Sequence, residues 1–140
     1  TATREIIQLL KEHGNHVQIL TKGGGSRDFD LLDENDWYGV TIDGKYSPDM
    51  YFGKFATLLM AKKKGIKTWV SFEPVIDAWN VLDCIELFHK DFDKAKIGKL
   101  NYYPSDIDWK SFGEQAETLC KKLGIDYYIK NSLRAEMEKK

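Results

Sequence analysis

The chain alternates between short apolar segments that favour strands and longer segments with helical periodicity. Branched and aromatic residues predict strands at 16–22, 37–43, 67–73, 95–101 and 126–130. Apolar spacing and capping signals predict helices at 4–13, 26–32, 52–64, 78–89 and 109–123, with a last short helix through Leu133. Regular alternation of strand and helix indicates parallel strands joined by right-handed helical crossovers. We therefore predict an α/β fold with about five parallel strands.

Length and composition narrow the classes of protein to consider. The 140 residues fit one domain, predicted to span 1–140, and the hydrophobic fraction of 42% is enough for a core. The 21 basic and 22 acidic side chains leave a net charge of −1, which gives no support to a nucleic-acid partner. No apolar run is long enough to predict a membrane span. Cys84 and Cys120 lie far apart and fit no disulfide framework, which favours a cytoplasmic location.

The loops that follow the strands carry more chemistry than the loops that precede them. They read "TKGGGS", "DGKYSPDM", "EPVID" and "NYYPSDID", whereas the helix-to-strand links are short and plain. In α/β folds the working face lies at the carboxyl ends of the strands. We therefore expect one polar face that brings together Thr21, Lys22, Asp43, Glu73, Asn101 and Lys130.

The run Gly23–Gly25 raises the question of a phosphate-binding loop. A P-loop is excluded because the lysine precedes the glycines. Gly23 and Gly25 match two places of the dinucleotide fingerprint, but Asp28 occupies the third, and Asp43 imitates the ribose-binding acid. Two other interpretations are a turn that needs positive φ and a thin loop that lets something lie over the strand ends.

The strand endings resemble a known family. The segments "ILTK", "WYGVTI", "VSFEPV", "KIGKLNY" and "YYIK" are similar to the C-terminal part of radical SAM proteins, in particular the spore-photoproduct-lyase-like, DNA-repair-photolyase-related group. The family's CxxxCxxC, which holds a [4Fe-4S] cluster, is absent from the chain. The resemblance implies a partial TIM-type (β/α) barrel, with strands four to eight of eight and the cluster site outside the chain. It also implies the C-terminal portion of a longer enzyme, with this chain alone inactive.

The resemblance assigns roles to individual strand-end residues, while the catalytic residues stay unknown. Lys22 would face the carboxylate of S-adenosylmethionine, with Thr21 and Gly23 beside it, although a solvent-facing lysine is an equal alternative. No cofactor is expected on this chain alone. Glu73 would contact substrate or cofactor, or else form an ion pair with Lys22 or Lys99. A polar ring would be completed by Asn101, Lys130 and Tyr102.

Aromatic and histidine residues are the remaining candidates for binding roles. Tyr102 and Tyr103, with Tyr46 and Tyr51 of another loop, could stack a nucleobase or simply anchor the loops. The histidines, which are His13, His16 and His89, have no sequence spacing typical of a metal site, so no metal is predicted. The tryptophans at 37, 69, 79 and 109 are expected to pack in the core or between helix and sheet.

Two alternative functions stay open from the sequence. The chain could be a stand-alone Rossmann-like nucleotide-binding module that uses Gly23, Gly25 and Asp43, or a non-catalytic α/β interaction domain. A partial barrel leaves two sheet edges unpaired, expected at the strands 16–22 and 126–130. Exposed edges invite pairing with another chain, so a homodimer is a possible form of the isolated chain.

Overall fold

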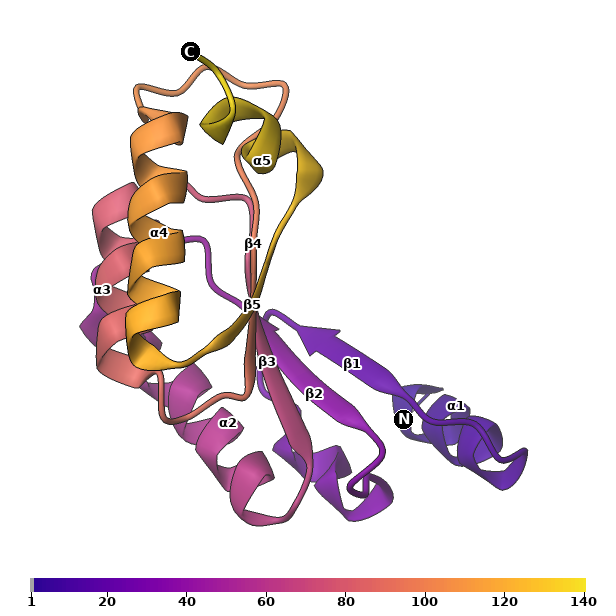
Figure 1. Ribbon diagram of the computed structural model, residues 1–140. Coiled ribbons are helices and arrows are strands. Elements are labelled where there is room, and N and C mark those ends of the chain that lie inside the picture. Colours follow the sequence, from indigo (N-terminus) through magenta and orange to yellow (C-terminus); the bar gives the residue numbers. More distant parts are fainter. Residues whose placement is uncertain (1) are drawn as a thin grey trace.

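The computed structural model describes residues 2–140, and its elements alternate as the sequence predicts (Figure 1). The strands are β1 (Gln18–Thr21), β2 (Trp37–Thr41), β3 (Lys67–Phe72), β4 (Lys94–Ile97) and β5 (Asp126–Ile129). The α-helices are α1 (Ala2–Glu12), α2 (Phe52–Lys63), α3 (Ala78–Phe88), α4 (Trp109–Leu123) and α5 (Asn131–Met137). Two 3-10 helices, η1 (Ser26–Leu31) and η2 (Pro48–Tyr51), lie in the loops after β1 and β2.

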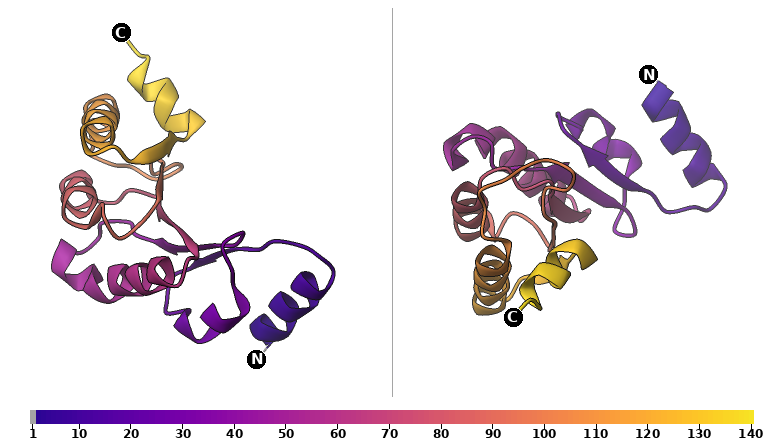
Figure 2. Two further views of the ribbon diagram at one scale, coloured as in Figure 1. Left: turned by 60° about the horizontal axis from the view of Figure 1, so that its bottom comes forward. Right: turned by 90° about the horizontal axis from the view of Figure 1, so that it is seen from above.

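The five strands form one parallel sheet whose spatial order is their order in the chain, β1-β2-β3-β4-β5. Because crossovers of one hand between successive neighbours place their helices on one side, α2, α3 and α4 all cover the same face (Figures 1 and 2). This is the winding of part of a (β/α) barrel, and it lacks the reversal of strand order that marks a doubly wound sheet. The predicted α/β fold is confirmed, with β1 and β5 at the edges of the sheet.

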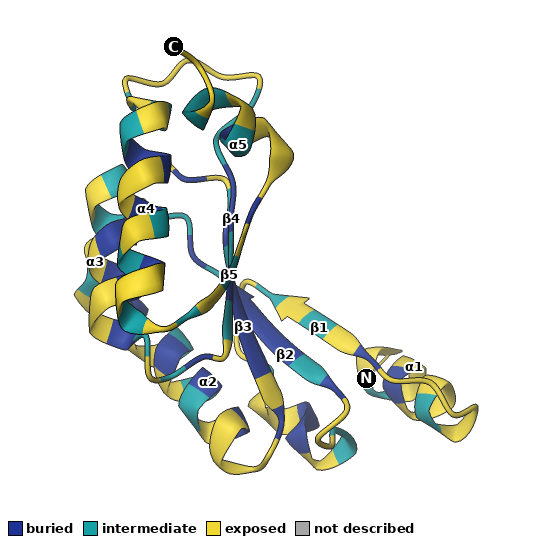
Figure 3. Cartoon of the chain, viewed as in Figure 1, coloured by how far each residue is buried: buried dark blue, intermediate teal, exposed yellow. Residues whose placement is uncertain are grey.

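The hydrophobic core lies between the sheet and these three helices, where buried residues concentrate (Figure 3). Val40, Val70 and Ile97 point into it and are fully buried. Phe55 of α2 stacks on Phe88 of α3 with ring centroids 4.0 Å apart. The side chains of Val40, Val70 and Ile97 therefore face the helices and not the uncovered face of the sheet.

The opposite face of the sheet carries a different set of side chains. Trp69 lies across Gly39 of the neighbouring strand, where a Cβ would come within 2.4 Å of the indole Nε1, and the Lys96 ammonium lies 4.6 Å from a Trp69 ring centroid. Leu20 and Tyr128 on the edge strands are 48% and 45% exposed. The indole therefore fills the middle of this face, while the two edges are open.

Helix ends follow the capping signals with two exceptions. Asp108 caps α4 by accepting from Ser111 N at 3.1 Å, and Gly124 ends it in the left-handed conformation with φ 70°. The helix α1 begins at Ala2, two residues before its predicted start at Arg4. Leu133 is not the end of the last helix, because α5 continues to Met137. Within the described residues, no helix combines the length and apolar character needed to cross a membrane.

A bidentate ion pair joins α4 to α5. Glu117 accepts from Arg134 Nη1 and Nη2 at 3.0 and 2.8 Å, and from Tyr127 Oη at 2.8 Å. The hydrogen bonds from Arg134, followed by that from Tyr127, lower the pKa of Glu117 from 4.5 to about 2. At neutral pH the ionised Glu117 side chain is therefore more stable in the folded chain than in the unfolded chain.

The Glu117 pair predicts a pH-dependent part of the stability. Its contribution is fully present above pH 4.5 and is lost as the pH falls towards 2, because the folded pKa is the lower one. We expect Glu117→Gln to lower the free energy of unfolding by roughly 1–3 kcal/mol at pH 6, discounted for partial exposure, and by less at pH 3. Urea titrations at both pH values measure this, with the exposed neighbour Glu114→Gln as control. An equal loss at the two pH values would contradict the assignment.

Candidate functional site

A cavity of about 300 Å³ opens at the carboxyl ends of β1, β2 and β3. These strand ends are adjacent because the strands are parallel neighbours in the sheet. Its walls combine apolar, hydroxyl and charged groups, as in a pocket that orients a polar ligand. The lining residues are Leu20, Lys22, Thr41, Asp43, Tyr46, Tyr51, Lys54, Ser71, Glu73 and Pro74.

Lys22 stands at the rim of this cavity, directly after β1. Its side chain is exposed, and no hydrogen bond or ion pair holds its ammonium among residues 2–140. Lys54 lines the same cavity, where burial first, and the charge of Lys22 to a smaller extent, lower its pKa. An ammonium without a protein partner at a cavity rim is suited to bind an anionic group.

Glu73 crosses the mouth of the cavity to the last strand of the sheet. It forms an ion pair with Lys130, with Nζ 2.8 Å from Oε2 and 3.0 Å from Oε1. The ion pairs predicted with Lys22 or Lys99 are therefore wrong, because Lys99 instead pairs with Glu136 at 2.9 Å. Gly98, directly after the intervening strand β4, leaves space for the Glu73 side chain, because a Cβ at this position would lie 2.8 Å from Glu73 Oε2.

Three polar side chains, of Asp43, Tyr51 and Lys54, line the β2 side of the cavity. Tyr51 Oη donates to Asp43 Oδ1 at 3.1 Å and accepts from Tyr46 N at 3.2 Å. Lys54 of α2 reaches back to donate to the carbonyl of Thr41 at 3.1 Å. Burial lowers the pKa of Lys54 and raises the pKa of Tyr51, so both groups sit in a partly dry environment.

Several predicted site residues do not line the cavity. The Thr21 hydroxyl accepts from Gly23 N at 3.0 Å, and in register Thr21 pairs with Val40, which faces the helices. Asn101 is half-buried and follows the end of β4 by four residues. Tyr102 is fully exposed with φ 70°, and within residues 2–140 the one ring contact among the four tyrosines considered for stacking is that of Tyr46 with Tyr51.

The glycine run is explained by packing at one of its positions. Gly25 lies against the ring of buried Tyr38, where a Cβ would come within 2.7 Å of a ring carbon. None of the three glycines has positive φ, so the turn interpretation is wrong. Asp28, in the third fingerprint place, is buried in an ion pair with Arg4 at 3.2 Å, and η1 is a short 3-10 helix. These contacts favour the thin-loop interpretation over a phosphate cradle.

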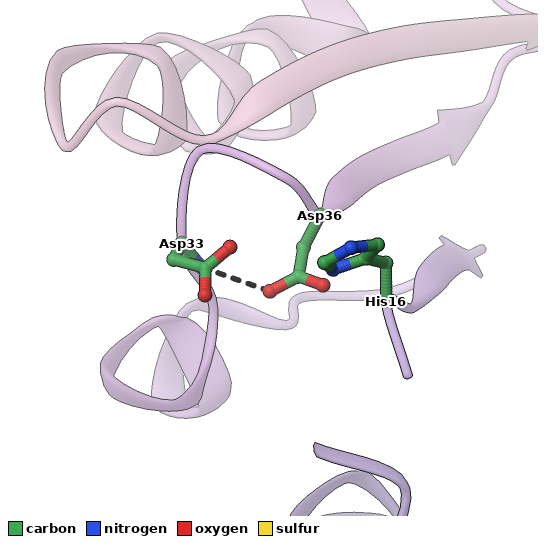
Figure 4. Close-up of side chains that lie close together, drawn as sticks. All are labelled: His16, Asp33 and Asp36. Atoms are coloured by element: carbon green, nitrogen blue, oxygen red, sulfur yellow. Dashed lines mark hydrogen bonds between the residues drawn. The ribbon is translucent and has the colours of Figure 1, made fainter. Parts of the chain in front are cut away.

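A second cluster, of His16, Asp33 and Asp36, lies at the opposite end of the sheet (Figure 4). Their ligand atoms lie within 4.8 Å of one another, which sequence spacing did not reveal because the loop 33–36 folds back beside His16. Lys11 already supplies a cation, bonding Asp33 Oδ2 at 2.8 Å and also Asp36 Oδ2. Asp36 further accepts from Val17 N and Asp33 N. The cluster therefore serves as a clip that joins α1, β1 and the loop before β2.

Sequence reasoning missed two cavity residues that weak signals could have found. Ser71 lies two places before Glu73, and strand alternation puts such a pair on one face. Lys54 is a cation in the first turn of α2, where the helix dipole disfavours a positive charge. A lysine at such a position indicates a role other than stabilising the helix.

Comparisons with protein-family models, curated proteins and solved structures found no match to the chain.

Proposed function

We propose that this chain is the C-terminal portion of a radical SAM enzyme, contributing contacts to S-adenosylmethionine and to substrate at the carboxyl ends of its strands. The observation that carries the proposal is the cavity beside β1–β3, which places unpartnered Lys22 across from the Glu73–Lys130 pair. The consecutive strand order supports it, because a partial barrel has this winding and a dinucleotide-binding sheet reverses direction.

The residues at the cavity fit the methionine part of S-adenosylmethionine. In such enzymes the cofactor supplies radical chemistry after reductive cleavage at an iron–sulfur cluster. Lys22 would hold the carboxylate of the cofactor, and Asp43, fixed by Tyr51, is a candidate acceptor for its amino group. Glu73, held by Lys130, would orient a polar group of the substrate.

The chain does not fit the cluster itself. A [4Fe-4S] cluster is held by cysteine thiolates. The two cysteines, Cys84 and Cys120, are both buried, and burial raises the pKa of their thiols to about 12 and about 11. The proposal therefore places the cluster site outside this chain, in a protein that we also propose to be cytoplasmic.

The most direct test is the reading frame upstream of the chain. Five strands of an eight-stranded barrel leave about 100 residues to be supplied, by the usual size of such barrels. We expect a CxxxCxxC within that upstream stretch, established by sequencing the coding region. Its absence from a complete upstream frame would reject the proposed function.

The proposed Lys22 contact can be tested in the longer protein that would carry the CxxxCxxC motif. Lys22→Ala is expected to weaken S-adenosylmethionine binding by roughly 1.5–3 kcal/mol, which is about 10–150-fold, because one charge-assisted contact is lost. Calorimetric titration measures the affinity. Lys63→Ala, an exposed lysine in the last turn of α2, is the control. Equal affinity of the Lys22 variant and the parent would assign Lys22 to the solvent.

The open edges of the sheet lead to a prediction about the isolated chain. The strands β1 and β5 each have one partner strand among the described residues, so their outer N–H and C=O groups are available for pairing. We expect a two-fold dimer formed through one of these edges at micromolar concentration. Light scattering measures the mass, and a clean monomer of 16.2 kDa would contradict edge pairing.

A further inference from the structure

A groove runs between α3 and α4 on the helix side of the sheet and shares no lining residue with the strand-end cavity. It consists of two hollows, of about 550 Å³ at the starts of the two helices and about 490 Å³ further along them. Trp79, Leu82, Ser111 and Gln115 line both hollows, so the two are continuous. We refer to this surface as the α3–α4 groove.

The wall of the groove holds an exposed tryptophan. Trp79 is 70% exposed, so the prediction that it packs in the core or against the sheet is wrong. The floor is apolar, with Leu82 and Phe112 buried beneath it and Ile107 and Leu119 partly buried beside them. An exposed tryptophan beside an apolar floor is typical of a protein-binding hot spot, because the indole gains much by burial.

The charge around the groove is strongly one-sided. Six acids line it against the single base Lys122, although the whole chain has 22 acidic and 21 basic residues. Two of the acids, Asp77 and Asp108, cap the helices. The other four form no ion pair with any residue of the described chain 2–140, so the groove keeps a net negative charge: Asp83, Glu86, Asp106 and Glu114.

We propose that the α3–α4 groove docks a basic amphipathic helix of a partner protein. An apolar ridge at i, i+3 and i+4 spacing would cover Trp79 and Leu82, while lysines or arginines on its flanks meet the acidic rim. The same acids repel the phosphates of nucleic acids and of anionic membranes, which excludes those ligands for this surface. The proposal is independent of the chemistry assigned to the strand-end cavity.

The first helix of a second copy of the chain fits the groove less well than a basic helix would. The helix α1 exposes Ile6, Leu9 and Leu10 and could in principle supply an apolar ridge. Its cations, Arg4 and Lys11, already lie in ion pairs, with Asp28 and Asp30 and with Asp33 and Asp36. Because α1 also carries Glu5 and Glu12, it offers the acidic rim no complementary charge.

The test uses a fluorescein-labelled 14-residue helical peptide of leucine and lysine, titrated with the full chain by fluorescence anisotropy. We expect saturable one-to-one binding that weakens in high salt, and no binding of a matched leucine–glutamate peptide. Trp79→Ala and the double variant Asp83→Lys/Glu86→Lys should each weaken binding at least tenfold. The double variant Glu12→Lys/Glu34→Lys changes net charge equally away from the groove and should weaken it less than threefold. Circular dichroism melts check that all variants fold.

Three outcomes would overturn the proposal. The first is no saturable binding of the lysine peptide, or equal binding of the glutamate peptide. The second is an equal loss in both double variants, which would assign binding to overall charge. The third is a dimer by light scattering that Trp79→Ala converts to monomer, which would assign the groove to a second copy.

Discussion

Replacing Asp36 by alanine is expected to lower the free energy of unfolding by about 3–5 kcal/mol, the range for breaking a buried charged pair from one side. The Asp36 side chain is 0% exposed and holds three donors. Val17 N and Asp33 N lie 2.8 and 2.9 Å from its oxygens, and the Lys11 ammonium bonds the same carboxylate. In Asp36→Ala two backbone N–H groups and the Lys11 ammonium lose this acceptor. Urea denaturation measures the resulting decrease in the free energy of unfolding.

Asp30→Ala is the matched control for this prediction. Asp30 also joins the first helix to the loops after β1, through Arg4 at 2.8 Å, but its side chain is 64% exposed. Exposed pairs contribute little because solvent screens them, so a much smaller loss than in Asp36→Ala is expected. Equal losses in the two variants would show that Asp36 does not act as a buried clip.

Asp36→Ala also tests whether the cluster is a structural ion-pair network or a metal site. Because the Lys11 ammonium already bonds both carboxylates of the cluster of His16, Asp33 and Asp36, added Zn²⁺ should leave the melting temperature of the parent chain unchanged. A rise in melting temperature with Zn²⁺ that Asp36→Ala abolishes would contradict the role given to Lys11 and would instead establish a metal centre.

The sequence predicted the elements because local physics determines them. Apolar runs such as that around Val70 become strands, and α4 spans the predicted range 109–123, with Asp108 and Gly124 as its caps. The boundaries moved by a few residues where the chain continues past a signal, as at Leu133. Strand order followed as well, since successive parallel strands joined by helices of one hand become neighbours.

The candidate site was predictable only in position. Lys22 and Glu73 follow strands, so they had to reach the carboxyl end of the sheet. The partner of Glu73 was not predictable, because Lys130 lies two strands away and the contact depends on the space that Gly98 leaves. Lys54 reaches the cavity from a helix, and Trp79 lies outside the core. Both positions depend on tertiary packing, which local sequence patterns do not predict.

Gly44→Ala is expected to destabilise the chain by about 2–4 kcal/mol, more than another left-handed glycine. Gly44 has φ 76°, which costs an alanine roughly 1–2 kcal/mol. An added Cβ would also lie 2.8 Å from the carbonyl oxygen of Asp77 and 2.7 Å from Val81 Cγ2. Backbone cannot yield as a flexible side chain can, so the clash adds to the conformational cost.

Gly65→Ala isolates the conformational part of that cost. Gly65 has φ 84°, but no atom lies within 4 Å of its added Cβ, so only about 1–2 kcal/mol should be lost. The excess loss in Gly44→Ala then measures how tightly the loop after β2 is held against α3, where Asn80 also donates to the Gly44 carbonyl at 2.8 Å. Equal losses by urea denaturation would show that this loop moves freely. A clear excess would show that α3 packs tightly against the loop that carries Asp43.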